Sequence, residues 1–369
     1  MGIPQIVFIT AITITTFSIS ILTGKIFAIG LNLSATATRW VILASILGPL
    51  LFIGTMILGR VWQSTFLNSI SYFVNALGGI IFYLFIVSII LGLILIAGKV
   101  FSFSVPVFIA YIFLGIGIIF GITGLIQAKF IKLTSYDIAL PNAPESWNGK
   151  RAVLVSDTHF GLVNHKEFSD KVVNKILEIK PDFVLHAGDF YDGPANDTKL
   201  ITESWKKLAS AVPVFYAPGN HEEYGDYAGF LTSIRNAGIN ALVDEVTLYE
   251  GVEIAGIAFR DKRQDEIAGK IIKNLKVDST KASILINHHP AFQKSAEDIG
   301  IDLMVAGHTH RGQFWPLYFM VKAVYGKYIY GVNVDNTITT LTTSGVGTAG
   351  PPMRLFNTPE LVLINFKTK

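Results

Sequence analysis

The first 127 residues contain no aspartate or glutamate, and this absence restricts the possible folds more than any other feature of the chain. Within this part lie four apolar runs without a charged residue, at 6–22, 40–58, 72–97 and 106–127. Each run is near the ~20 residues that an α-helix needs to cross a bilayer. Soluble helices of this length have a polar face, and these runs have none. We therefore predict a transmembrane anchor of about four helices over residues 1–127.

The charges divide the chain at the same place. Only four basic residues lie in 1–127, so residues 128–369 hold the other 26 basic residues and all 27 acidic residues. All eight histidines also lie in this second part. The net charge of +3 is thus the sum of +4 and −1, which gives no basic stripe for nucleic acid. The chain has no cysteine, which excludes disulfide scaffolds and cysteine-based zinc or redox sites.

The basic residues beside the apolar runs bear on topology. Lys25, Arg39 and Lys99 fall on one side of the predicted bundle. Arg60, Lys129, Lys132 and the terminal amine fall on the side of the C-terminal domain. Because basic residues favour the cytoplasmic side, we expect that domain to be cytoplasmic, in the inner membrane if the protein is bacterial.

The second part alternates short apolar runs with segments of helical periodicity, which is typical of a layered α/β domain. We expect this domain over 150–369 and a linker over 128–149, with a hinge in the proline-containing stretch 141–149. Predicted helices cover 168–179, 200–211, 227–237 and 267–275. Predicted strands cover 151–156, 182–187, 212–217, 241–249, 252–258, 283–286, 303–306, 341–343 and 361–365.

Polar residues follow five of the predicted strands. They are Asp157 and His159, then Asp189, then Asn220 and His221, then His288 and His289, and finally His308 and His310. Ligand sites of α/β sheets lie at the carboxyl ends of the strands, so we expect these groups to converge in one cleft. Carboxylate and imidazole groups without thiolate suit Mn²⁺, Fe or Zn²⁺. Two such ions can clamp a phosphoryl group and generate hydroxide at neutral pH.

The order D-x-H, G-D, G-N-H-E, H and G-H-x-H resembles the calcineurin-like metallophosphoesterase family over residues 151–310. The resemblance implies an α/β/β/α sandwich, with two mixed β-sheets flanked by helices, and a site for two divalent metal ions. It implies that a metal-bridging hydroxide attacks phosphorus, and that His221 protonates the leaving oxygen or stabilises the phosphate charge. The implied ligands are Asp157, His159 and His310 for one ion, Asn220, His288 and His308 for the other, and Asp189 as the bridge.

Two assignments remain open at this stage. Either His288 or His289 can be the isolated family histidine, and the usual His-x-Pro spacing favours His288. His289 then contacts a ligand from behind, contacts the substrate, or is a surface loop residue. Glu222 either orients ligands from behind or belongs to a solvated acidic pair.

The segments after His310 resemble the membrane-associated subgroup of this family, which includes bacterial proteins likened to lipid-sugar pyrophosphatases. They are S-G-V-G-T at 344–348, P-M-R-L-F at 352–356 and P-E at 359–360. Arg354 either pairs with a second phosphate or forms a surface salt bridge. Arg311 replaces the glycine usual in the family and is a second candidate for phosphate contact. The aromatic-rich stretch 314–330 is either a core hairpin or an apolar lobe beside the metals at the bilayer interface.

These observations predict a membrane-anchored, dimetal hydrolase of a phosphate ester or pyrophosphate bond. The expected partners are the bilayer and a phosphorylated, lipid-linked substrate. One alternative is hydrolysis of a soluble nucleotide or phosphoprotein. Another is a membrane scaffold that uses the same fold without catalysis, but such a scaffold would be expected to lack metal ligands.

Overall fold

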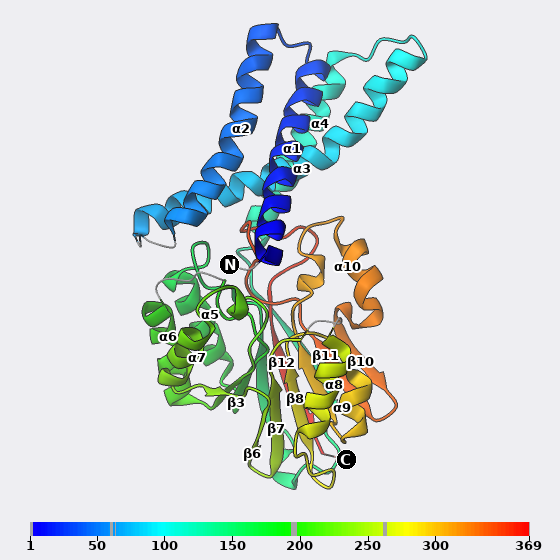
Figure 1. The fold of residues 1–369 in the computed structure, drawn as a ribbon. Helices are drawn as coiled ribbons and strands as arrows, with labels where there is room; N and C mark the ends of the chain where they lie inside the picture. Colours follow the sequence, from blue (N-terminus) through cyan, green and yellow to red (C-terminus); the bar gives the residue numbers. More distant parts are fainter. Residues whose placement is uncertain (1–2, 60–61, 63, 193–197, 261–263, 369) are drawn as a thin grey trace. The chain divides into compact units, whose positions relative to one another are not determined.

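Four long helices begin the chain in the computed structural model, which describes residues 3–59, 62, 64–192, 198–260 and 264–368 (Figure 1). They are α1 (Ile3–Gly30), α2 (Ala35–Leu58), α3 (Thr65–Val100) and α4 (Val107–Gln127). All four are long and apolar enough to cross a membrane by length and composition. The prediction of four N-terminal apolar helices is confirmed.

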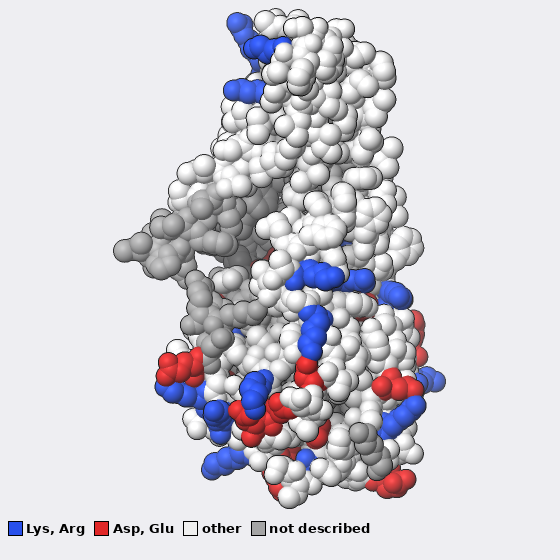
Figure 2. Space-filling model, turned by 90° about the vertical axis from the view of Figure 1, so that its right-hand side faces the viewer, with Lys and Arg blue, Asp and Glu red and all other residues white. Residues whose placement is uncertain are grey.

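The first three helices extend beyond the charge-free runs. Lys25 lies in α1, Arg39 in α2 and Lys99 in α3, and the membrane-capable segment of α1, Thr13–Gly30, includes Lys25. Long basic side chains near helix ends can extend their charge to the polar interface, so the helix continues past the apolar stretch. Figure 2 shows basic groups at one end of the otherwise white helical part. Arg60 lies outside the described residues.

A second compact unit comprises residues 127–349 and 354–369, whereas 1–126 and 350–353 form the first. The second unit contains two six-stranded sheets. The first sheet has the order β1 (Lys132–Ala139), β12 (Glu360–Lys367), β2 (Arg151–Val155), β3 (Phe183–His186), β4 (Val214–Tyr216) and β5 (Asn240–Ala241). The second has the order β10 (Gly331–Asp335), β11 (Ile338–Thr342), β9 (Leu303–Ala306), β8 (Ser283–Asn287), β7 (Val252–Ile257) and β6 (Glu245–Tyr249).

Both sheets are mixed, as predicted. In the first, β2 to β5 are parallel and β12 is antiparallel to β2. In the second, β11, β9, β8 and β7 are parallel, while β10 and β6 pair antiparallel at the two edges. The parallel strands therefore bring their carboxyl ends to one edge of each sheet.

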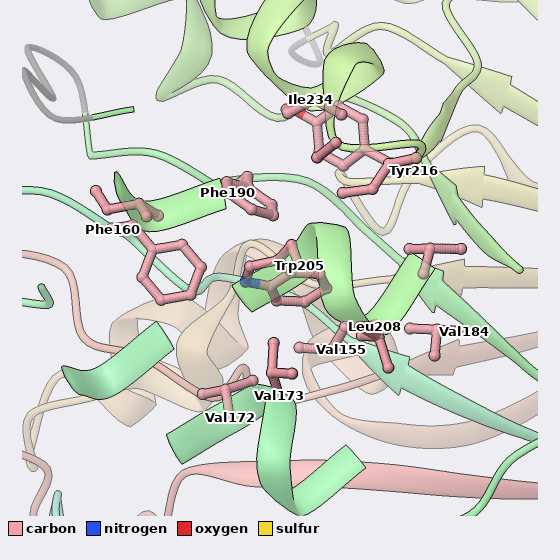
Figure 3. Packing of buried hydrophobic residues seen from close by; sticks show 14 of the residues in the cluster. Val155, Phe160, Val172, Val173, Val184, Phe190, Trp205, Leu208, Tyr216 and Ile234 are labelled. Carbon is pink, nitrogen blue, oxygen red and sulfur yellow. The ribbon is translucent and has the colours of Figure 1, made fainter. Parts of the chain in front are cut away.

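Alternate residues of β2 face two different cores. Val153 and Val155 join the core between the first sheet and helices α5 (Lys166–Ile179), α6 (Thr198–Ala211) and α7 (Tyr227–Asn236). Ala152 and Leu154 join the core between the two sheets. Since side chains alternate along a strand, this explains why the run is apolar throughout. Figure 3 shows Trp205 of α6 at the centre of the first core.

A third core lies between the second sheet and helices α8 (Asp265–Asn274) and α9 (Gln293–Asp298). The layers are therefore helix, sheet, sheet and helix, as the family resemblance implied. Three segments differ from expectation. Residues 128–149 contain β1, whose parallel pairing with β12 makes it part of the first sheet rather than a free linker. The expected strand 241–249 is two strands in different sheets, β5 and β6. The possible hairpin at 314–330 instead contains helix α10 (Tyr318–Tyr325).

Candidate metal centre

The predicted ligands follow the carboxyl ends of five parallel strands, and the structure brings them together. Asp157 and His159 follow β2, Asp189 follows β3, Asn220 follows β4, His288 follows β8, and His308 and His310 follow β9. The aspartate and histidine ligand atoms form groups of three within 4.8 Å of one another. We call Asp157, His159 and His310 the first cluster, and Asp189, His288 and His308 the second cluster. His221 forms a further group with His159 and Asp189.

The first cluster is closely packed and buried. His310 Nε2 lies 3.2 Å from Asp157 Oδ1 and 2.9 Å from His159 Nε2. The two imidazole rings stack with their centroids 4.9 Å apart. The amide of His308 donates to both oxygens of Asp157 at 3.1 Å, so the second cluster's loop also fixes this carboxylate.

Asp189 connects the two clusters. Its Oδ2 lies 3.1 Å from His288 Nε2 in the second cluster and 3.7 Å from His159 Nε2 in the first. Its Oδ1 accepts a hydrogen bond from the amide of His221 at 2.9 Å. A carboxylate in this position can contact ions on both sides, as expected of a bridging ligand.

The backbone at the site is unusual. Five of the predicted ligands have left-handed φ angles, namely Asp157 (56°), His159 (47°), Asp189 (52°), His308 (69°) and His310 (46°). Few residues other than glycine adopt this conformation, and it costs of order 1–3 kcal/mol. Such a concentration of strain is typical of functional sites.

Two motif glycines leave room for the carboxylates. A Cβ at Gly219 would lie 2.1 Å from Asp189 Oδ1, and one at Gly307 would lie 2.4 Å from Asp157 Oδ2. Any larger residue at these positions would displace a ligand. The glycines of the G-N-H and G-H-x-H motifs therefore follow from close approach of the backbone to the site.

The donor set fits divalent cations. Asn220 Oδ1 is buried without a hydrogen-bond partner, although buried polar atoms are nearly always paired. Burial holds the pKa values of His308 and His310 well below the usual range, which keeps these imidazoles neutral and able to bind a cation. Oxygen and nitrogen donors without sulfur suit Mn²⁺, Fe²⁺ or Zn²⁺. Asn220 itself precedes His221, whose amide contacts Asp189.

His221 is supported by a carboxylate that the motifs did not indicate. Its Nδ1 lies 2.9 Å from Asp192 Oδ1, and His159 Nδ1 lies 3.5 Å from the same atom. Burial lowers the pKa of His221, but the carboxylates of Asp189 and Asp192 outweigh it and raise that pKa to about 9. The two carboxylates thus favour the protonated form of His221. The only signal for Asp192 in the sequence is its place three residues after Asp189.

The structure distinguishes the neighbouring histidines. His288 Nε2 points to Asp189 and lies 3.2 Å from His308 Nδ1. His289 is also buried rather than on a surface loop, and its ring packs edge-on against His308 at 5.2 Å between centroids. Tyr325 of α10 contacts the rings of both His289 and His308. His288 therefore has the ligand geometry, and His289 is a packing neighbour.

Glu222 is fully buried, which is inconsistent with a solvated pair. Its Oε2 accepts hydrogen bonds from the amides of Gly219 at 2.7 Å and Asp189 at 3.2 Å. Its Oε1 accepts from the amide of Tyr191 at 2.9 Å. The side chain thereby joins the loops after β3 and β4, which carry Asp189 and Asn220.

The two candidate phosphate-binding arginines differ sharply. Arg311 is partly exposed, and its guanidinium stacks over the ring of Tyr330 at 4.3 Å. Arg354 is fully buried and donates to backbone carbonyls, so it forms no surface salt bridge. Of the two, only Arg311 keeps a position from which a substrate is accessible.

Comparison with known proteins agrees with this geometry. The family model for calcineurin-like phosphoesterases matches residues 150–312. An uncharacterized metallophosphoesterase of Campylobacter jejuni is 30% identical over 245 residues, which are 65% of this chain and 64% of the relative. An uncharacterized metallophosphoesterase of Aquifex aeolicus is 28% identical over 274 residues, which are 69% of this chain and 98% of the relative.

A transmembrane protein with a metallophosphoesterase domain from Danio rerio is 28% identical over 264 residues, which are 68% of this chain and 60% of the relative. The chain thus spans somewhat less than two thirds of the C. jejuni and D. rerio relatives. The matched family agrees with the two-sheet fold, and the D. rerio relative is named as a transmembrane protein. The chain therefore contains a calcineurin-like phosphoesterase domain, with four membrane-capable helices ahead of it.

Proposed function

We propose that the protein is a membrane-anchored, dimetal phosphoesterase that hydrolyses a phosphate ester or pyrophosphate bond. The observation that carries the proposal is the position of Asp189 between two clusters of buried oxygen and nitrogen donors. Asp157, His159 and His310 would hold one ion, and Asn220, His288 and His308 the other. Two divalent cations in such a site supply charge neutralisation for the phosphoryl group and a hydroxide nucleophile at neutral pH.

His221 is the proposed catalytic acid. The carboxylates of Asp189 and Asp192 favour its protonated form. Nδ1 is bonded to Asp192, so Nε2 remains to donate a proton to the leaving oxygen or a hydrogen bond to the phosphate. Asp192 fixes the ring and its tautomer, which is the role of a positioning residue.

Hydrolysis of a generic aryl phosphodiester by the full chain in detergent tests the reaction. We expect turnover that depends on added Mn²⁺ and that is lost in Asp189→Ala and His221→Ala. Asp278→Asn, which changes an exposed carboxylate, is the matched control. Absence of Mn²⁺-dependent turnover, or full activity in the Asp189 and His221 variants, would refute the proposal.

We further propose that the substrate is lipid-linked. Helix α10 has no buried residue, and its Phe319 and Met320 are 62% and 67% exposed. Tyr325 at the end of the same helix contacts His308 of the second cluster, with ring centroids 5.9 Å apart. An exposed apolar surface therefore begins one ring away from a proposed ligand, where an acyl or prenyl chain can lie while the phosphate occupies the centre.

The connection to the membrane helices supports the same proposal. Only residues 128–131 separate the end of α4 from the start of β1. The phosphoesterase domain is therefore joined by a short stretch of sequence to a membrane-capable helix. Lys322 of α10 adds a basic group suited to a lipid interface.

Paired assays separate the lipid-linked substrate from a soluble nucleotide or phosphoprotein. The double variant Phe319→Ser with Met320→Ser should slow hydrolysis of a detergent-dispersed polyprenyl pyrophosphate and leave aryl phosphodiester turnover unchanged. Val334→Ser, at an exposed valine of β10, is the control. Equal effects on both substrates, or no effect on either, would favour the soluble alternative. Metal binding without any turnover would favour the scaffold.

We place the catalytic domain on the cytoplasmic side, in the inner membrane if the protein is bacterial. The basic residues Lys129 and Lys132 beside this domain motivate the assignment. Because the chain has no cysteine, a single Lys129→Cys substitution reports the side directly. A membrane-impermeant maleimide applied to intact cells should leave it unlabelled, and labelling would reverse the topology.

A further inference from the structure

Arg354 is a fully buried arginine that stands behind the first cluster. Its Nη2 lies 3.1 Å from His310 Nδ1, and its Nη1 donates to the carbonyl of His310 at 3.4 Å. The guanidinium therefore bonds the backbone of this proposed ligand and lies against its ring. His288 of the second cluster differs, because its Nδ1 lies 2.6 Å from the carbonyl of Ala187.

The same guanidinium binds the loop that follows β11. Nη1 donates to Ser344 O at 2.7 Å, Nη2 to Gly345 O at 3.2 Å, and both Nη2 and Nε to Gly347 O at 2.6 and 3.1 Å. With the bond to the carbonyl of His310, five donations to four backbone carbonyls use all five N–H groups of arginine. No N–H group remains for a phosphate, so Arg354 is not a substrate contact.

That loop packs directly against Asp157. The amide of Gly347 donates to Asp157 O at 2.9 Å, and a Cβ at Gly345 would lie 2.7 Å from the Cβ of Asp157. Asn357 also donates to His310 O. Arg354 thus joins the two segments that carry Asp157 and His310, which follow strands of different sheets.

We propose that Arg354 is a positioning residue for the first ion, and that it fixes Asp157 and His310 at ligand distance. The proposal rests on the proposed metal site but not on turnover. Arginine is suited to this role because a planar fork can bind several carbonyls in fixed directions, which a lysine ammonium cannot. Removal of the fork leaves several buried carbonyls without a donor and lets the two ligands move apart.

Mn²⁺ titration of the full chain in detergent, followed by calorimetry and electron paramagnetic resonance, tests the proposal. Asp157→Asn and His288→Gln are the reference variants. The titration curve and resonance spectrum of the first define the signature of losing the first ion, and those of the second define the signature of losing the second ion. We expect Arg354→Lys and Arg354→Gln to weaken one of two Mn²⁺ sites at least about tenfold, the scale seen for residues that orient metal ligands. Their spectra should match the Asp157→Asn signature, and excess Mn²⁺ should restore the second ion. Arg235→Gln, on the exposed face of α7, is the matched control.

Thermal unfolding in EDTA establishes whether the Arg354 variants fold. If Arg354→Gln does not fold, Asn357→Ala is the second variant. It removes one hydrogen bond to His310 O and should weaken the same Mn²⁺ site to a smaller degree. Unchanged affinity at both sites in a folded variant would overturn the proposal, as would a loss with the His288→Gln signature. A wild-type chain that binds two Mn²⁺ ions without turnover would instead refute the proposed function and leave this inference intact.

Discussion

The two clusters are supported from different parts of the chain. Behind the second cluster, the carbonyl of Ala187 and the carboxylate of Glu222 lie within a few residues of Asp189 and Asn220. Behind the first cluster, Arg354 lies 44 residues after His310. The second cluster therefore carries its support within its own motifs, whereas the first depends on a distant C-terminal segment. Ligand residues alone give no indication of this asymmetry.

Replacement of the shared carboxylate should affect both clusters and have the largest effect. Asp189→Asn removes one carboxylate charge that both clusters share. That carboxylate lies 3.1 Å from His288 Nε2 and 3.7 Å from His159 Nε2. We expect both Mn²⁺ affinities to fall and aryl phosphodiester turnover to drop at least on the order of a thousandfold. Calorimetry and initial rates measure the two effects. If one Mn²⁺ ion still bound with wild-type affinity, Asp189 would serve a single cluster.

Asp192 offers a test on the side of the first cluster that spares the ligands themselves. Asp192→Asn leaves a neutral partner for His221, so the pKa of His221 should fall from about 9 and less of the imidazole should be protonated. We expect kcat to fall about a hundredfold, the alkaline limb of the pH–rate profile to move to lower pH, and two Mn²⁺ ions to remain bound. Loss of an ion would instead make Asp192 a support of His159.

The sequence indicated the residues of both clusters because each follows a buried strand, and strand ends converge in this fold. Asp192 and Arg354 could not be placed in the same way. Asp192 approaches His221 only because the chain folds back after β3, with its amide donating to Phe160 O. Arg354 reaches His310 through a loop whose path no local pattern specifies.

The layered fold was predictable from alternating apolar runs, but three elements were not. Strand β1 has mostly exposed residues, and its polar sequence resembles a linker until β12 pairs with it. The step from β5 to β6 depends on a turn that contains Asp244, at a φ of 59°, and transfers the chain to the other sheet. Aromatic residues have a high strand propensity. The aromatic-rich stretch 314–330 therefore did not indicate helix α10, which lies within it.

Glu222 offers the corresponding test of the second cluster. Glu222→Gln replaces one acceptor oxygen by an NH₂ group. Depending on the orientation of the amide, this group faces either the N–H groups of Gly219 and Asp189 or the N–H group of Tyr191. An unsatisfied buried donor costs about 1–3 kcal/mol. We expect a lower melting temperature and about tenfold weaker Mn²⁺ binding at one site, with the His288→Gln signature. A loss shared by both sites would mean that the two supports are not separate.

Arg311 should give the smallest effect and separates substrate contact from metal support beside the first cluster. Its guanidinium stacks on Tyr330 and, among the described residues, makes no hydrogen bond or ion pair. If it binds a phosphate oxygen, Arg311→Gln should raise KM about fivefold, the scale of a partly exposed hydrogen bond worth ~1 kcal/mol, without a change in kcat or Mn²⁺ affinity. Arg235→Gln, which removes an exposed arginine of α7, should change none of these values. An unchanged KM would show that the stack on Tyr330 is the whole role of Arg311. Weaker Mn²⁺ binding would instead mean that Arg311, like Arg354, helps to position the first cluster.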